Sequence, residues 1–150
     1  MLNTMQRMSG IATVASLYMQ EVEGLPVKIL DTRKTTPGMR FLEKQAVLHG
    51  GCHNYRAGLY DWIMIKDNHV EACGDIALAI DRVHEYLQKT NKDLSITIEV
   101  RNLVELQKVL DHGGVTRIMM DNFEIPILKE AVAMVGKRFE TEASGGIDLH

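Results

Sequence analysis

The chain has 150 residues, of which 45% are apolar and 25% charged, and its net charge is −3 at pH 7. This length and composition predict one soluble globular domain, residues 1–150, with a sizeable core. The small negative charge argues against general affinity for nucleic acid or membrane surfaces, and no apolar run reaches the ~18 residues that a membrane helix needs.

The first expected helix covers residues 3–22, where apolar residues recur at spacings of three and four. Gly24 and Pro26 end it. From there strands and helices alternate. The expected strands cover residues 27–30, 62–65, 96–98, 117–120 and 139–143, with helices at 39–49, for about 15 residues from Asp75, at 103–110, and once more before the last strand. Strict alternation predicts an α/β fold with a parallel sheet and right-handed crossovers.

Polar residues lie at or just beyond the C-terminal ends of several of these strands. They are Arg33 and Lys34, Lys66 and Asp67, Glu99, Asp121 and Glu142. In a β/α barrel such ends meet on the face that carries the active site, and in an open α/β sheet they line a crevice. A full barrel usually needs about 200 residues or more, so about four and a half visible β/α units predict a partial β/α barrel.

The two cysteines, Cys52 and Cys73, form neither a disulfide framework nor the paired spacing of a zinc site. His49 and His53 also fail as a metal pair, because Gly50 and Gly51 would break the helix between them. No secretory signal opens the sequence. These features predict a cytoplasmic protein, while an organelle stays open if a transit peptide has been removed.

Charge is concentrated in residues 31–69, which hold six Lys/Arg against four Asp/Glu, net +2. A mildly basic island in an acidic chain suits a small anionic ligand. Arg33 and Lys34 pair a planar cation with a point charge, which favours carboxylate or phosphate groups. A solvated loop stays the alternative. The loop lacks the glycines of a Walker A motif.

Two further groups each have two readings. The four residues 66–69 form either part of a site or a surface turn. Glu99 and Asp121 end consecutive strands, where they could hold Mg²⁺ or ribose hydroxyls, or serve as helix caps and surface acids. The segment 54–56, Asn-Tyr-Arg, says little alone.

Several ordered motifs make the sequence resemble quinolinate phosphoribosyltransferase, the carboxylating nicotinate-nucleotide pyrophosphorylase, a type II phosphoribosyltransferase. The similar stretches are residues 5–13 (MQRMSGIAT), 30–38 (LDTRKTTPG), 65–69 (IKDNH), 99–100 (EV), 120–122 (MDN) and 140–146 (ETEASGG). Together and in order they are far more specific than any one of them.

The resemblance implies that quinolinate and phosphoribosyl pyrophosphate give nicotinate mononucleotide, pyrophosphate and CO₂ in NAD biosynthesis, with Mg²⁺ bound. The implied catalytic residues are Lys34, Lys66, Glu99 and Asp121. The implied substrate-binding residues are Arg33, Lys34, Tyr55, Arg56, Lys66, Glu99, Asp121, Ser144 and Gly145. The cations among them would hold the pyridine dicarboxylate, while Glu99 and Asp121 would face the ribose and Mg²⁺. The resemblance also implies a homodimer or higher homo-oligomer of the full-length protein.

The sequence departs from the family in three respects. Tyr55 stands where the family usually has histidine, so one quinolinate contact is open. The family's N-terminal α/β domain, which supplies an arginine across the dimer interface, and its last barrel strands are not in this sequence. We therefore expect low activity from these 150 residues alone. Two alternatives stay open: a related type II phosphoribosyltransferase for another pyridine acid, and a non-catalytic fragment that only binds anions.

Overall fold

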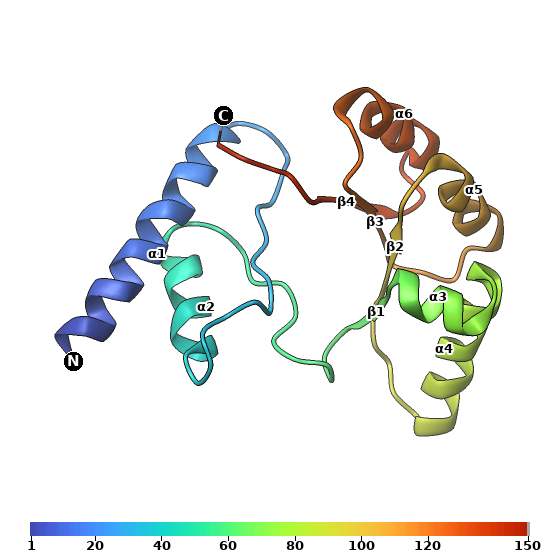
Figure 1. The fold of residues 1–150 in the computed structure, drawn as a ribbon, viewed down its shortest axis with the longest axis horizontal. Helices are drawn as coiled ribbons and strands as arrows, with labels where there is room; N and C mark the ends of the chain where they lie inside the picture. Colours follow the sequence, from blue (N-terminus) through green and yellow to red (C-terminus); the bar gives the residue numbers. More distant parts are fainter. Residues whose placement is uncertain (150) are drawn as a thin grey trace. The chain divides into compact units, whose positions relative to one another are not determined.

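A computed structural model describes residues 1–149, which divide into two compact units (Figure 1). Unit 1 comprises Met1–Leu59 and the chain end from Asp148, and unit 2 comprises Tyr60–Ile147. The single domain expected over residues 1–150 stays a prediction. No helix in residues 1–149 is long and apolar enough to cross a membrane.

Unit 1 is built on two helices, α1 (Leu2–Glu21) and α2 (Arg40–His49), which confirm the two helices expected in this region. Gly50, which follows α2, packs directly against α1: a Cβ added there would lie 2.5 Å from Ala15 Cβ and from the Ala12 carbonyl oxygen. Ala15 is also buried. The close approach of the end of α2 to α1 therefore depends on a residue without a side chain.

The strand expected at residues 27–30 is wrong. The structure has one isolated parallel bridge there, between Leu30 and His53. The His53 amide donates to the Ile29 carbonyl (2.8 Å), and the Asp31 amide donates to the His53 carbonyl (3.0 Å). A strand needs a neighbour that stays in register over several residues, and here the pairing ends after one. The apolar run predicted extended backbone, but it could not supply the partner.

Unit 2 holds a parallel sheet with strands in the order β1-β2-β3-β4. Its elements in chain order are β1 (Ile63–Ile65), α3 (Asp67–Cys73), α4 (Ile76–Thr90), β2 (Ile96–Val100), α5 (Leu103–His112), β3 (Arg117–Asp121), α6 (Ile125–Val135) and β4 (Glu140–Ser144). Helices cover one face of the sheet (Figure 1). The expected α/β architecture is confirmed: within the described chain the sheet is open, as a partial β/α barrel requires.

The two faces of the sheet differ because side chains alternate along each strand. On the helix-covered face the strands contribute Ile96, Ile98, Val100, Ile118 and Met120 to the core. These side chains pack with apolar residues of α4, α5 and α6, and all are nearly or completely buried. The intervening residues point to the opposite face. They are Thr97, Glu99, Arg117, Met119, Asp121, Glu140, Glu142 and Ser144.

Helix α3 was not expected from the sequence. The sequence predicts a polar site or a surface turn at residues 66–69, and in the structure Asp67, Asn68 and His69 form the first turn of α3. Lys66 is the N-cap residue, and its amide donates to His69 Nδ1 (2.9 Å). The Asn68 amide donates to Asp67 Oδ1 (2.7 Å). These polar side chains therefore satisfy amides that a helix N-terminus leaves without intrahelical partners.

Candidate active site

In unit 1 the polar loop after Leu30 begins at a buried ion pair. Lys44 Nζ lies 2.6 Å from Asp31 Oδ1, and both side chains are only 7% exposed. The same Asp31 oxygen accepts the Tyr55 amide at 2.8 Å. With its amide oriented to satisfy its neighbours, Asn54 donates to Asp31 Oδ2 (2.7 Å) and to the Lys44 carbonyl (3.0 Å). Asp31 thus joins the start of the loop to the segment that carries Tyr55 and Arg56.

The end of this loop at Thr36 is held by Glu43, the buried residue of α2 that precedes Lys44. Glu43 accepts the Thr36 amide at 3.0 Å and Arg7 Nε at 2.6 Å. Burial raises the pKa of Glu43, but the hydrogen bonds from Thr36 and Arg7 outweigh it, so the pKa lies below its ordinary value. Sequence reasoning missed this role of Glu43 and Lys44, because charged residues on a short helix are normally solvated.

The two predicted cations of the loop differ in environment. Arg33 is partly buried, and its Nε atom is fully buried with no hydrogen-bond acceptor among residues 1–149. Lys34 is exposed, and its amide donates to Thr32 Oγ1 at 3.0 Å. Buried donors in proteins are normally paired. Arg33 Nε is therefore a buried donor without an acceptor among the described residues, and the exposed Lys34 ammonium group is a second cation on the same loop.

Tyr55 and Arg56 lie on the second segment of unit 1, and both are partly buried. The structure brings this segment to the start of the Arg33 loop through Asp31, as the hydrogen bond from the Tyr55 amide demonstrates. Unit 1 therefore holds the predicted residues Arg33, Lys34, Tyr55 and Arg56 on two connected segments.

In unit 2, Lys66 and Glu99 form an ion pair between neighbouring strand ends. Ile65 of β1 is in register with Ile98 of β2, which sets the next residues side by side. Lys66 Nζ lies 3.3 Å from Glu99 Oε2, with the lysine side chain 47% and the glutamate side chain 11% exposed. The structure therefore brings together one predicted cation and one predicted carboxylate.

Asp121, Ser144 and Gly145 also meet in unit 2. Asp121 is in register with Ser144 across β3 and β4, and the Asn122 amide donates to the Ser144 carbonyl at 2.8 Å. Asn122 Nδ2 donates to Asp121 Oδ2 at 2.8 Å. Gly145 has φ +83°, and a Cβ there would collide with the Asn122 side chain. The absence of a side chain at Gly145 therefore lets its backbone lie close to the Asp121–Asn122 pair.

Glu142 does not lie at or beyond a strand end, where the sequence predicts it. It lies in the middle of β4 and is bound to Arg117 at the start of β3 (3.1 Å). Burial raises the pKa of Glu142, and Arg117 lowers it, with a net rise above its ordinary value. The Arg117 guanidinium stacks over the Trp62 ring at 4.9 Å, and Trp62 Nε1 donates to Thr97 Oγ1 at 2.8 Å. Glu142 therefore belongs to a packed polar layer.

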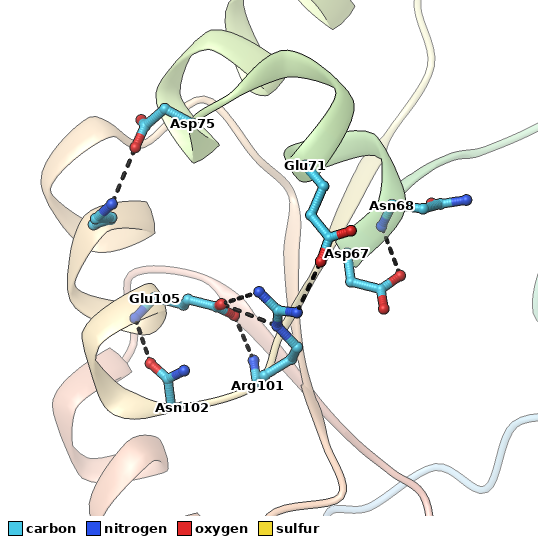
Figure 2. Close-up of polar contacts among 8 residues, drawn as sticks. Asp67, Asn68, Glu71, Asp75, Arg101, Asn102 and Glu105 are labelled. Atoms are coloured by element: carbon cyan, nitrogen blue, oxygen red, sulfur yellow. Dashed lines mark hydrogen bonds and ion pairs between the residues drawn. The ribbon is translucent and has the colours of Figure 1, made fainter.

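Figure 2 shows how the turn after β2 is joined to its neighbours. Arg101 contacts Glu105 of α5 at 2.7 Å and Glu71 of α3 at 3.4 Å. Asn102 caps α5 by accepting the Glu105 amide at 2.9 Å. Arg101 and Glu71 are both about half exposed or more, so the pair between them stabilises the fold by at most about 1 kcal/mol, whereas the Glu105 side chain is only 17% exposed. The effect of these contacts is to hold α3 and α5 beside the strand ends that carry Lys66 and Glu99.

A metal would have few protein ligands. Residues 1–149 contain no group of three or more His, Cys, Asp or Glu side chains arranged to hold a metal ion. Glu99 and Asp121 point to the same face of the sheet, because Glu99 is in register with Met119 and Asp121 follows two residues later. Mg²⁺ typically takes one or two carboxylates with waters and substrate phosphates as its other ligands. The donor set therefore fits Mg²⁺ rather than a closed protein cage.

Comparison with known proteins identifies the family. Residues 11–150 match the family model described as quinolinate phosphoribosyl transferase, C-terminal domain. The chain is 45% identical to the chloroplastic nicotinate-nucleotide pyrophosphorylase (carboxylating) of Arabidopsis thaliana, with 99% of this chain and 46% of the relative covered. It is 42% identical to the probable nicotinate-nucleotide pyrophosphorylase (carboxylating) of Bacillus subtilis, with 99% of this chain and 50% of the relative covered.

Solved structures agree with the sequence comparison. The crystal structure of NadC from Streptococcus pyogenes has a TM-score of 0.91 and 36% identity, over 99% of this chain and 50% of that one. Nicotinate-nucleotide pyrophosphorylase from Ehrlichia chaffeensis has a TM-score of 0.88 and 41% identity, over 96% of this chain and 51% of that one. The chain thus spans about half the length of the relatives it matches. It belongs to the quinolinate phosphoribosyl transferase family, within the C-terminal domain of that family.

Proposed function

We propose that this chain is the catalytic-core segment of a quinolinate phosphoribosyltransferase. The protein would convert quinolinate, phosphoribosyl pyrophosphate and a proton into nicotinate mononucleotide, pyrophosphate and CO₂. The names of relatives at 42–45% identity support this activity. The observation that carries it is the placing of three cations, Arg33, Lys34 and Arg56, on two segments that Asp31 joins, which suits a substrate with carboxylate groups.

The proposed binding roles follow from the charge of each side chain. Arg33, Lys34 and Arg56 bind the carboxylates of quinolinate, because guanidinium groups match carboxylates with two parallel hydrogen bonds. Lys66 supplies a further cation. Tyr55 supplies a phenolic hydroxyl, which donates a hydrogen bond but carries no positive charge at neutral pH.

The proposed chemistry needs no general base. The pyridine nitrogen has a free lone pair and forms the bond to ribose C1 as the bond from C1 to pyrophosphate breaks. The ribosyl centre becomes cation-like at that point, and the carboxylates of Glu99 and Asp121 favour such a charge. Ser144 and Gly145 would contact the same substrate. Loss of CO₂ then leaves an electron pair on the ring carbon, which takes up the proton, and Lys34 and Lys66 stabilise that charge.

We also propose that Glu99 and Asp121 hold Mg²⁺, which would neutralise charge on the leaving pyrophosphate. The paired carboxylate chemistry on one face of the sheet supports this assignment. A titration of the full-length protein with Mn²⁺, followed by the water-proton relaxation rate, tests it. We expect weaker binding in the Glu99→Gln and Asp121→Asn variants, and unchanged binding would contradict the assignment.

The test of the main proposal uses the full-length protein with quinolinate, phosphoribosyl pyrophosphate and Mg²⁺. We expect nicotinate mononucleotide and CO₂ in equal amounts, and no product when quinolinate is omitted. Absence of quinolinate-dependent product would overturn the proposal. Light scattering on the same sample tests the proposed homodimer or higher homo-oligomer, for which a monomer is the contrary result. We further propose a cytosolic or organellar location, which a fluorescent fusion of the full-length protein tests.

A second candidate is a related type II phosphoribosyltransferase for another pyridine acid. Tyr55 favours it, because a neutral hydroxyl binds a second carboxylate more weakly than a cationic side chain does. Comparing kcat/KM for quinolinate and nicotinate separates the two. A higher value for quinolinate supports the main proposal, and a higher value for nicotinate supports the second. If neither turns over but quinolinate binds, the chain is a non-catalytic anion-binding protein.

A further inference from the structure

Arg40 joins the two segments of unit 1 that carry Arg33 and Arg56 with one guanidinium group. Its Nε donates to Thr35 Oγ1 at 3.2 Å, and one terminal nitrogen lies 3.4 Å from the Arg33 carbonyl oxygen. Its other terminal nitrogen donates to the Ala57 carbonyl at 3.2 Å. Ala57 directly follows Arg56. The side chain therefore contacts the backbone of Arg33 on one segment and the backbone next to Arg56 on the other.

The position of Arg40 in its helix is unfavourable by itself. Arg40 is the first residue of α2, where the helix dipole presents its positive end and favours an acidic side chain. Three acceptors on neighbouring segments offset this repulsion. A guanidinium is planar and carries five donors in fixed directions, whereas an ammonium group is a single point on a flexible stem. Lysine could keep the charge at this position but could not span the same three acceptors.

The helix beneath Arg40 is itself anchored. Glu43 and Lys44 lie three and four residues further along α2, on the same helix face. Both are buried, and they bind Thr36 and Asp31 at the two ends of the Arg33 loop. The contacts of Glu43 and Lys44 therefore fix the two ends of the Arg33 loop on α2. The contacts of Arg40 then hold the middle of the loop against the Arg56 segment.

We propose that Arg40 is a positioning residue that sets the separation of Arg33 and Arg56, and thereby favours a substrate with two adjacent carboxylates over one with a single carboxylate. This inference rests on the proposed function. A ligand with two carboxylates on neighbouring ring carbons needs both cationic segments at a fixed spacing. A ligand with one carboxylate needs only one of them, so loss of the spacing should weaken the dicarboxylate more.

The test is steady-state kinetics of the full-length protein carrying Arg40→Lys. We expect KM for quinolinate to rise about ten-fold, the effect of losing one or two hydrogen bonds. The Ki of nicotinate as a competitive inhibitor, and KM for phosphoribosyl pyrophosphate, should each change less than about two-fold, because neither needs the spacing. A merely structural role would lower the active fraction, which reduces kcat and leaves the ratio of KM to Ki unchanged.

Two further variants complete the experiment. Arg138→Lys makes the same change at an arginine that also donates to a carbonyl, that of Met134 at 3.1 Å, but that belongs to unit 2 and to neither segment. It should leave the ratio unchanged. Thr35→Val removes only the hydroxyl that Arg40 binds and should raise the ratio about three-fold, which keeps the test decisive if Arg40→Lys does not fold.

The outcomes separate this inference from the proposed function. No turnover of quinolinate by the wild type overturns both. Wild-type turnover with an unchanged KM-to-Ki ratio in Arg40→Lys and in Thr35→Val overturns this inference alone. A rise of the ratio in both variants, with none in Arg138→Lys, supports it.

Discussion

Asp31 and Lys44 form a salt bridge of 2.6 Å between side chains that are both 7% exposed, and the same Asp31 oxygen accepts the Tyr55 amide. A buried charge without its partner is strongly unfavourable, whereas removing both charges of a buried pair is often tolerated. This pair therefore decides whether the Asp31 loop and the Tyr55 segment stay together.

We expect Lys44→Met to lower the free energy of unfolding of the full-length protein by about 3–5 kcal/mol, because Asp31 keeps a buried charge. The double variant Asp31→Asn, Lys44→Met should recover part of that loss. Urea unfolding measures both values. Lys129→Met, at an exposed position of α6, is the control and should change the free energy by less than about 0.5 kcal/mol. An equal loss in the single and double variants would contradict the prediction.

The Lys66–Glu99 pair should act as a unit in the reaction. Lys66→Met and Glu99→Gln are each expected to lower kcat/KM for quinolinate about 10²-fold, since each removes charge from the proposed site. The double variant should lose less than the product of the two, because the residues contact each other at 3.3 Å. Steady-state kinetics measures these losses, with Lys89→Met, an exposed residue of α4, as the control. Fully multiplicative losses would mean that the pair is not coupled.

Gly145 should not tolerate a side chain. Gly145→Ala places a Cβ at φ +83° and against Asn122, so we expect a loss of about 1–3 kcal/mol in unfolding free energy and lower activity. Gly10→Ala, in the middle of α1 with nothing within 4 Å of the added Cβ, should instead gain about 0.5–1 kcal/mol. Thermal unfolding of the two variants of the full-length protein compares them. Equal effects would show that the backbone at Gly145 is not restrictive.

Two glutamates should change stability with pH in opposite directions. The pKa of Glu43 lies below 4.5 in the folded protein. The ionised side chain therefore adds to the free energy of unfolding above pH 4.5, and this stabilisation is lost as pH falls through the folded pKa. The pKa of Glu142 lies above 4.5. The protonated side chain therefore adds to the free energy of unfolding below pH 4.5, and this stabilisation is lost as pH rises through the folded pKa. Relative to wild type, Glu43→Gln should therefore be least stable near neutral pH, and Glu142→Gln should gain relative stability there. Urea unfolding at pH 4, 5.5 and 7 measures both slopes, and slopes of the same sign would contradict the assignment.

The sequence by itself determined the elements whose pattern is local. The apolar runs of β2 and β3 and the periodic helices α4 and α5 carry their own signal, because residue alternation and helical spacing depend only on neighbours in the chain. The polar residues after the strands, among them Lys66 and Asp121, were predicted for the same reason. The ordered motifs around Arg33 and Lys34 pointed to the family that the comparisons then identified.

Only the tertiary structure decided what depends on a partner distant in sequence. Residues 27–30 have strand-like composition, but a strand forms only when a neighbour stays in register, and here the pairing stops at Leu30 and His53. Glu43 and Lys44 are buried, and their contacts with Thr36 and Asp31 come from residues outside their own helix. The sequence predicts Glu142 at a strand end, whereas the structure places it in the middle of β4 in an ion pair with Arg117. In each case the structure depends on a contact with a residue outside the local segment, which the local sequence pattern does not reveal.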